Sequence, residues 1–210
     1  MAVIVRIAES DVETRLAELR LSRDVVIDTV RACVAAYGGC TDNDPPSARG
    51  YEPWRYGTRH LRELLLPADL GWAKDDTANL SSVRHDEIRI KLIVLNTDAL
   101  TGSLSPEPGP QNRLKKGILH ERAIGGATGW LPNLPKPFDE PVHDVWYLCV
   151  HINGEKVLAE LSRPAAIENG FIVSWKERIL IVGPEDWAKM DFSGLDDDLG
   201  PDFDVNVRRK

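Results

Sequence analysis

The sequence predicts an α+β protein in which N-terminal helices pack on a mixed, mostly antiparallel sheet that ends in a C-terminal β-meander. Two observations support this fold class. Apolar residues recur at helical spacing between Val12 and Leu65. From Asp144 to Val182, apolar and polar residues alternate instead with period two, around turn signals at Asn153-Gly154 and Asn169-Gly170. The first pattern is typical of amphipathic helices and the second of half-buried strands.

The helical part divides at a few capping signals. Ser10 begins a capping-box pattern, which predicts a helix start. A second start at Ser22 leads to a stop at Gly38, and the pattern leaves open whether the two are one kinked helix or two helices. Pro53 is expected to open the next helix in its first turn, where its missing N–H is not needed. A short strand is expected within residues 1–8.

The hairpin after Asp144 predicts the faces of the sheet. A two-residue turn at Asn153-Gly154 would pair Ile152 with Glu155 and Val150 with Val157. The run 171–183 then forms one long bent strand or splits at Lys176-Glu177. One face of the hairpin is expected to be buried and the other mixed and partly wet. The buried set is Trp146, Leu148, Val150, Val157, Ala159 and Leu161, and the wet set is Tyr147, Cys149, His151, Lys156, Leu158 and Glu160.

Composition favours a single globular domain over residues 1–184 and an acidic tail over 185–210. The chain of 210 residues carries a net charge of −7, and eight acids against one lysine between Glu185 and Asp204 account for it. An acidic tail on a neutral body argues only weakly against a nucleic-acid partner. No apolar run approaches the roughly 20 residues that span a bilayer, so no membrane partner is expected. The three cysteines lack CxxC spacing, which favours the cytoplasm.

A strand expected from Asp86 to Leu95 holds the candidate catalytic residues. By the period of two, Glu87, Arg89 and Lys91 share one face of this strand. Asp76, or its neighbour Asp75, precedes the strand by a distance that a hairpin could close. Two carboxylates and a lysine are what a magnesium-dependent nuclease requires, so Asp76 and Glu87 are the candidate metal ligands and Lys91 the assisting base. The competing interpretation is a solvated strand with alternating charges.

This acid-then-lysine pattern resembles the PD-(D/E)xK nuclease superfamily, over about residues 54–182. The resemblance implies a restriction-endonuclease-like core, a bound Mg²⁺ and a DNA substrate. The chain departs from the pattern, because Arg89 stands where the superfamily has its lysine. Arginine stays protonated and does not accept protons. Either Lys91 substitutes from the same face, or the site is degenerate and only binds nucleic acid.

Two long connections complete the set of candidate functional segments. The loops at 97–117 and 129–143 are rich in proline and longer than most loops in compact domains, which is typical of binding loops. The first contains a cluster of basic and amide side chains suited to a phosphate backbone: Gln111, Asn112, Arg113, Lys115 and Lys116. The alternative function is a non-catalytic regulatory module whose two loops become ordered on a protein partner, or a homodimer.

Overall fold

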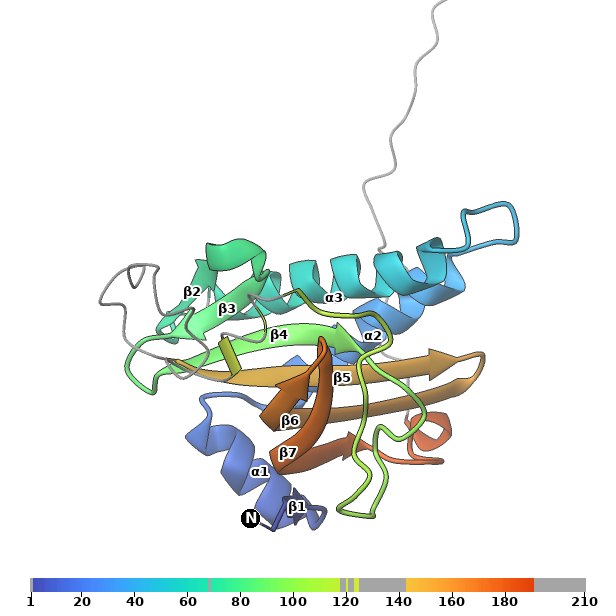
Figure 1. Ribbon diagram of the computed structural model, residues 1–210. Helices are drawn as coiled ribbons and strands as arrows, with labels where there is room; N and C mark the ends of the chain where they lie inside the picture. Colours follow the sequence, from blue (N-terminus) through green and yellow to red (C-terminus); the bar gives the residue numbers. More distant parts are fainter. Residues whose placement is uncertain (1, 68, 118–119, 121–122, 125–142, 191–210) are drawn as a thin grey trace, which may run out of the picture.

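Seven strands form one mixed sheet that runs through the whole molecule (Figure 1). The computed structural model describes residues 2–67, 69–117, 120, 123–124 and 143–190. The strands lie in the order β1-β7-β6-β5-β4-β3-β2, with parallel pairing of β1 to β7 and of β4 to β5. Their bounds are β1 (Ile4–Arg6), β2 (Trp72–Asp75), β3 (Ser82–His85), β4 (Ile90–Asn96), β5 (Asp144–Asn153), β6 (Lys156–Glu168) and β7 (Phe171–Val182).

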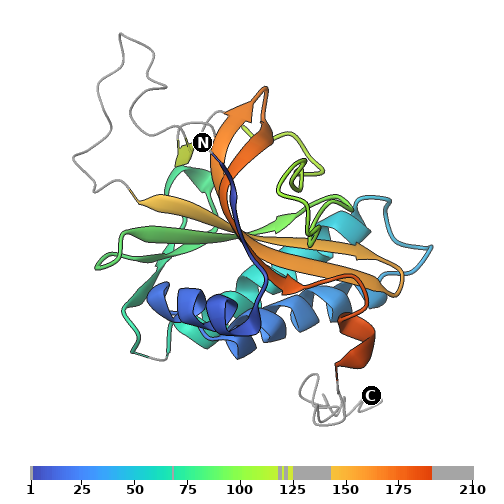
Figure 2. The ribbon, with the colours of Figure 1, turned by 90° about the horizontal axis from the view of Figure 1, so that it is seen from below.

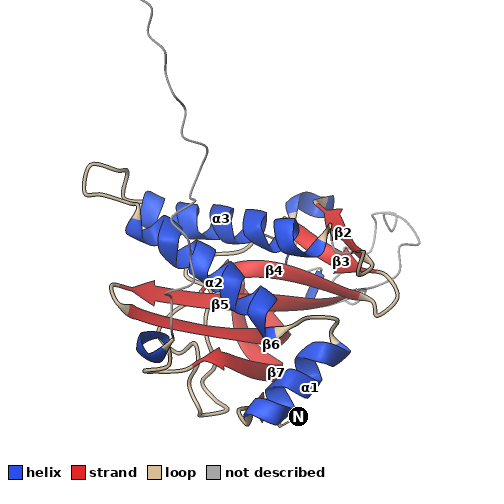
Figure 3. Ribbon diagram, turned by 180° about the vertical axis from the view of Figure 1, so that it is seen from behind, coloured by secondary structure: helices blue, strands red, loops and turns tan. Residues whose placement is uncertain are grey.

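Three helices cover one face of this sheet, as Figure 3 shows from the helical side. They are α1 (Glu9–Glu18), α2 (Arg23–Gly38) and α3 (Ala48–Leu65), and two short 3₁₀ turns follow later, η1 (Thr77–Asn79) and η3 (Trp187–Lys189). Leu16, Val30 and Leu61 meet Trp146 and its neighbours from the sheet in the larger hydrophobic core. The arrangement confirms the predicted α+β class.

The first two helices are separate because the chain turns sharply between them. Arg20 adopts a left-handed φ of 56°, which ends α1. Ser22 then caps α2, since its side chain accepts a hydrogen bond from the backbone N–H of Val25. The capping box predicted at Ser10 is wrong: the first turn closes on the carbonyl of Ala8, so Ser10 lies inside the helix and makes no capping bond.

The third helix also begins earlier than expected. Pro53 lies inside α3, five residues after its start, and is buried. The prediction that Pro53 opens the helix is therefore wrong. A proline ring interrupts one backbone hydrogen bond of a helix, and burial of the amphipathic face of α3 against α2 and β4 holds the helix together across that interruption.

The strand expected from Asp86 starts only at Ile90. Residues 86–89 form the turn between β3 and β4, and Arg89 adopts a left-handed φ of 51° there. Val83 pairs with Leu92 and His85 with Ile90, so β3 and β4 are an antiparallel hairpin. Glu87 and Arg89 are consequently turn residues, and the prediction that they share a strand face with Lys91 is wrong.

The β5–β6 hairpin forms with a shifted register. Asn153 pairs with Lys156 and Val150 with Ala159, so the two turn residues are Gly154 and Glu155. Gly154 has a φ of 60°, the conformation for which glycine is favoured in such turns. The predicted partners are wrong by two residues. Because two residues is one full period of a strand, the predicted buried face is nevertheless correct.

The second face of the sheet is covered as well. Tyr147, Cys149 and Glu160 are fully buried there, whereas Lys156 is exposed and His151 half-buried. The predicted wet face is therefore wet only near the hairpin turn. Residues 97–117, here called the strap, lie across β5, β6 and β7 on the face opposite the helices (Figure 2). A smaller hydrophobic core forms on this face, made of Leu80, Ile93, Leu95, Val145, Tyr147, Cys149, Ile172 and Trp175.

Candidate functional site

An aspartate and a lysine meet on the strap side of the sheet, at the end that carries β2. Asp75 ends β2 and Lys91 is the second residue of β4, and the Lys91 Nζ lies 2.6 Å from the Asp75 Oδ2. The backbone N–H of Thr77 donates to the Asp75 Oδ1 at 2.8 Å. Asp75 is only 3% exposed. Both oxygens of this carboxylate therefore have a cationic or N–H neighbour within the protein.

The environment keeps this carboxylate ionised. Burial alone would raise the pKa of Asp75, but its contacts with Lys91 and Thr77 outweigh burial and lower the pKa to about 2. At neutral pH the site is thus a carboxylate with an ammonium partner.

Asp76, the predicted catalytic and metal-binding acid, is turned away from this pair. It makes ion pairs with Arg62 at 2.5 Å and with Lys74 at 3.1 Å. The hydrogen bond from Arg62 is the main reason that the pKa of Asp76 is lowered. Arg62 belongs to α3, on the opposite side of the sheet. Asp76 follows the last residue of β2, and its carboxylate is engaged by Arg62 on the α3 side, so only Asp75 contacts Lys91.

Glu87 lies apart from both aspartates. In the β2–β3 ladder Asp75 pairs with Ser82 and Trp72 pairs with His85. Asp76 therefore follows one end of the ladder and Glu87 the other. The Glu87 side chain is 74% exposed, and its nearest cationic neighbour, Arg20, is 3.8 Å away. The structure does not bring the three predicted catalytic residues Asp76, Glu87 and Lys91 together.

The donor set does not fit the implied magnesium ion. Among the residues that the structure describes, no three or more His, Cys, Asp or Glu side chains lie close enough together to bind one metal ion. Asp75, the one acid that lies beside Lys91, already has both oxygens engaged. Mg²⁺ requires carboxylate oxygens that are free to bind it. We therefore derive no catalytic step through a metal at this site.

The predicted nucleic-acid-binding residues have three different environments. Asn112 is 3% exposed and is structural: its amide N–H donates to Leu114 and Gly170, and its oxygen accepts from Ile172. Lys116 is half-buried, and burial lowers its pKa. The other three, Gln111, Arg113 and Lys115, are exposed. The structure thus leaves Arg113 and Lys115 as the cations of this segment that solvent can reach.

A histidine adjoins the strap near this segment. His120 Nδ1 lies 2.9 Å from the hydroxyl of Tyr147, which is fully buried. Burial, with a smaller contribution from Lys116, lowers the pKa of His120 to about 4, so the imidazole is neutral at pH 7. Sequence reasoning did not pair these two residues because 27 positions separate them. Of the loop at 129–143, only His143 lies within the described residues, because residues 118–119, 121–122 and 125–142 lie outside them.

Similarity to known proteins does not indicate a family for this chain. Comparison with protein families, with curated proteins and with solved structures found no match to this chain. Within the described ranges, no helix is both long and apolar enough to cross a bilayer.

Proposed function

We propose that the protein binds the phosphate backbone of a nucleic acid through Arg113 and Lys115, and that it does so without metal-dependent hydrolysis. The observation that supports the proposal is the anchoring of this segment by Asn112. Two of its hydrogen bonds, with Gly170 and Ile172, tie the segment to the β6–β7 turn, and a third, to the Leu114 carbonyl, lies within the segment. Neither Arg113 nor Lys115 forms an ion pair with another residue in the part of the chain that the structure describes. Two exposed cations are therefore held at a fixed position, free to contact phosphates.

The Asp75–Lys91 pair supports a nuclease-like arrangement that binds nucleic acid but does not hydrolyse it. An acid and a lysine lie side by side on a β2–β3–β4 meander, although the acid is Asp75 and not Asp76. The poor fit of this site to a metal favours the degenerate version of the resemblance, which binds but does not cut. Binding is expected to be weak, because two phosphate contacts give a slope of log K against log salt of about −2 on duplex DNA.

Fluorescence anisotropy with labelled single-stranded DNA, duplex DNA and RNA tests the binding. Lys115→Glu should weaken binding at least tenfold at low salt and reduce the salt slope by about one. Lys156→Glu is the matched control, because Lys156 is an exposed lysine at the opposite end of β6. Equal effects of the two variants would show that only overall charge matters, and would contradict a site at this segment.

Incubation with plasmid and single-stranded substrates, with and without Mg²⁺ or Mn²⁺, tests the absence of hydrolysis. We expect no cleavage. Cleavage that Asp75→Asn abolishes and Glu87→Ala retains would overturn the proposal and place a metal at Asp75. Cleavage that Glu87→Ala abolishes would instead support the original nuclease interpretation of that residue.

A second candidate function is protein binding through α3. On its outer face Tyr51 is 53% and Tyr56 is 39% exposed, and the Arg55 guanidinium lies 4.3 Å from the Tyr56 ring. Tyrosine and arginine are enriched at protein interfaces. Arg55 pairs with Glu52, which leaves this face nearly neutral and favours a protein over a nucleic acid.

Sedimentation equilibrium tests one form of this second function, self-association. If α3 forms a homodimer, the double variant Tyr51→Ser/Tyr56→Ser should be monomeric at concentrations where the wild type is dimeric. A wild type that sediments as a monomer at all concentrations would exclude the homodimer. Binding of nucleic acid that depends on Lys115 would favour the first candidate.

A further inference from the structure

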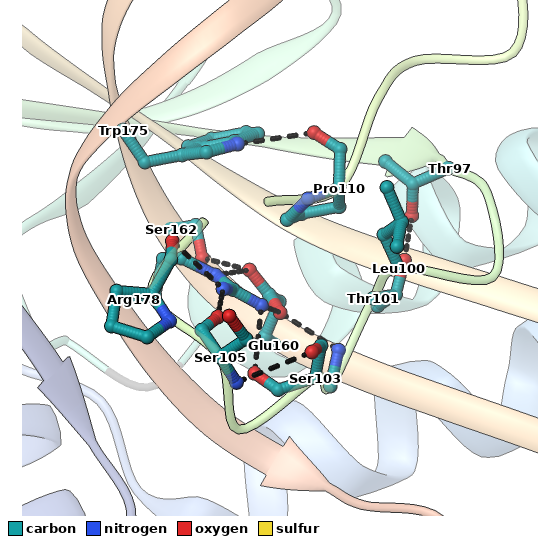
Figure 4. Close-up of polar contacts among 12 residues, drawn as sticks. Thr97, Leu100, Thr101, Ser103, Ser105, Pro110, Glu160, Ser162, Trp175 and Arg178 are labelled. Carbon is teal, nitrogen blue, oxygen red and sulfur yellow. Dashed lines mark hydrogen bonds and ion pairs between the residues drawn. The ribbon is translucent and has the colours of Figure 1, made fainter. Parts of the chain in front are cut away.

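The strap is held to the sheet mainly by polar contacts, and Figure 4 shows the central ones. Trp175 on β7 donates its indole N–H to the Pro110 carbonyl at 3.0 Å. Asn112 ties the C-terminal part of the strap to the β6–β7 turn. At the N-terminal part, Thr97 donates its backbone N–H to the Val150 carbonyl at 2.9 Å. These contacts fix the strap at both ends and near its C-terminal third.

Between these points the strap rests on a buried ion pair. Glu160 on β6 and Arg178 on β7 are both 0% exposed, and Arg178 Nη2 lies 2.6 Å from Glu160 Oε2. Apart from a hydrogen bond that the Ser162 hydroxyl on β6 donates to Glu160, the other hydrogen bonds of the pair go to the strap. Glu160 accepts from the backbone N–H of Gly102, and Arg178 donates to the carbonyls of Ser103 and Ser105. The loop backbone thus completes the hydrogen bonding of two buried charges.

Few apolar side chains of the strap are buried. Leu100, Leu104 and Leu114 are 36%, 63% and 75% exposed. The side chains that the strap does bury are mostly polar, such as Thr97, Thr101 and Asn112. The helical face, by contrast, carries the larger hydrophobic core. Segments that bury little apolar surface and are held by hydrogen bonds are the ones that open first in native proteins.

From this contrast we infer that the strap opens as a unit while the sheet and the helices stay folded, which exposes the Glu160–Arg178 pair and the thiol of Cys149. The strap is then a built-in cover for the second face of β5, β6 and β7. Opening loses polar contacts, re-hydrates two charges that water solvates well, and uncovers the part of the smaller hydrophobic core that lies under the strap, such as Trp175. It does not expose the core between the sheet and the helices.

Two cysteines report on this opening separately. Cys149 is fully buried on the strap side, where burial raises its pKa and the nearby carboxylates of Glu160 and Asp98 raise it further. Cys33 is fully buried in the helix-side core, where burial raises its pKa to about 12. A thiol reagent reaches Cys33 only when the helices separate from the sheet. Local opening of the strap should expose Cys149 alone.

Alkylation by N-ethylmaleimide, followed by peptide mass spectrometry in increasing urea, provides the test. We expect Cys149 to react at least tenfold faster than Cys33 in the absence of urea. Its rate should rise less steeply with urea than the Cys33 rate, because local opening exposes less surface than global unfolding, which the Cys33 rate should follow. The backbone amides of 98–112 should exchange hydrogen with the same opening equilibrium as Cys149. Equal rates and equal urea dependence for the two cysteines would overturn the inference.

A matched pair of variants separates strap opening from general loss of stability. Trp175→Phe removes the indole hydrogen bond to the strap and should raise the ratio of Cys149 to Cys33 alkylation about fivefold. Trp72→Phe removes an equivalent indole hydrogen bond, to the Arg20 carbonyl on the helical side, and should leave that ratio unchanged. If both variants change the ratio equally, or if Cys149 reacts quickly while the strap amides stay protected, the strap is not the cover.

Discussion

Gly57 of α3 lies close to both α2 and β4, and this gives a sharp prediction for Gly57→Ala. A Cβ added at this position would lie closer than 3.0 Å to the Cys33 Sγ on α2 and 3.2 Å from the Val94 Cγ1 on β4. Gly57, Cys33 and Val94 are all buried, so no flexible side chain can move aside into solvent. The three elements must shift to accept one methyl group.

Two opposing effects set the size of the change. Overpacking of a well-packed core typically destabilises by about 1–3 kcal/mol. Replacing glycine by alanine inside a helix stabilises by roughly 1 kcal/mol. The contact with Sγ is very close, so the cost of overpacking should lie at the upper end of its range, and we expect Gly57→Ala to lower the free energy of unfolding by about 2 kcal/mol. This should be measurable as a lower urea midpoint at unchanged m-value.

A double-mutant cycle with Cys33→Ala identifies the cause. Removal of the Sγ leaves space for the new methyl group, so Gly57→Ala should become neutral or stabilising in the Cys33→Ala background. The coupling free energy between the two substitutions should be at least about 1 kcal/mol, as for side chains in direct contact. Additive effects of the two substitutions would refute the reasoning, because the destabilisation would then not arise from the contact with sulfur.

The remaining predictions concern buried charges and one turn. Asp75→Asn should lower stability at pH 7 by about 2 kcal/mol, whereas Asp76→Asn, at an exposed ion pair, should change it by less than about 1 kcal/mol; both are measured by urea unfolding. The folded pKa of Asp75 is about 2, below its ordinary 3.8. The stabilisation that the ionised Asp75 gives to the folded protein is therefore present above about pH 4 and is lost as the pH falls toward 2. In Asp75→Asn, the free energy of unfolding should vary less with pH in that window. For Glu177, burial raises the pKa but hydrogen bonds from Arg15 and Arg6 lower it overall, so Glu177→Gln should destabilise less at pH 3 than at pH 7 in the same assay. Gly170→Ala should lower the thermal midpoint, because Gly170 has a φ of 82° and a Cβ there would lie 2.5 Å from the Lys116 carbonyl oxygen.

Local patterns in the sequence predicted the elements and the inner face of the sheet. The alternation of Trp146, Leu148 and Val150 survives the two-residue register error because it depends on the period and not on the turn. What the alternation did not reveal is that the other face is also buried. The sequence pattern predicts that Glu160 is exposed to solvent. Its burial depends on Arg178 and on the strap, whose Gly102 lies 58 positions away in the chain.

The candidate site was predicted only in part for a similar reason. The sequence indicated Lys91 as the candidate base and either Asp75 or Asp76 as the acid beside it. It could not show which of the two aspartates contacts Lys91. That depends on where β2 ends and on its pairing with β3. The position of Glu87 was predicted wrongly because the expected strand included residues 86–89, which form a turn in which Arg89 has a positive φ. Positive φ at a non-glycine residue leaves little trace in a single sequence.

The pairing of β1 with β7 has a consequence for biosynthesis. Arg6 near the start of the chain shares the Glu177 carboxylate with Arg15, and 171 residues separate Arg6 from Glu177. At ordinary translation speeds of about 5–20 residues per second, the first strand waits roughly 10–30 s on the ribosome before its partner is synthesised. During that time the backbone of Ile4–Arg6 lacks the β7 partners with which it pairs in the folded protein. Pairing at this edge of the sheet can therefore begin only after β7 has been synthesised.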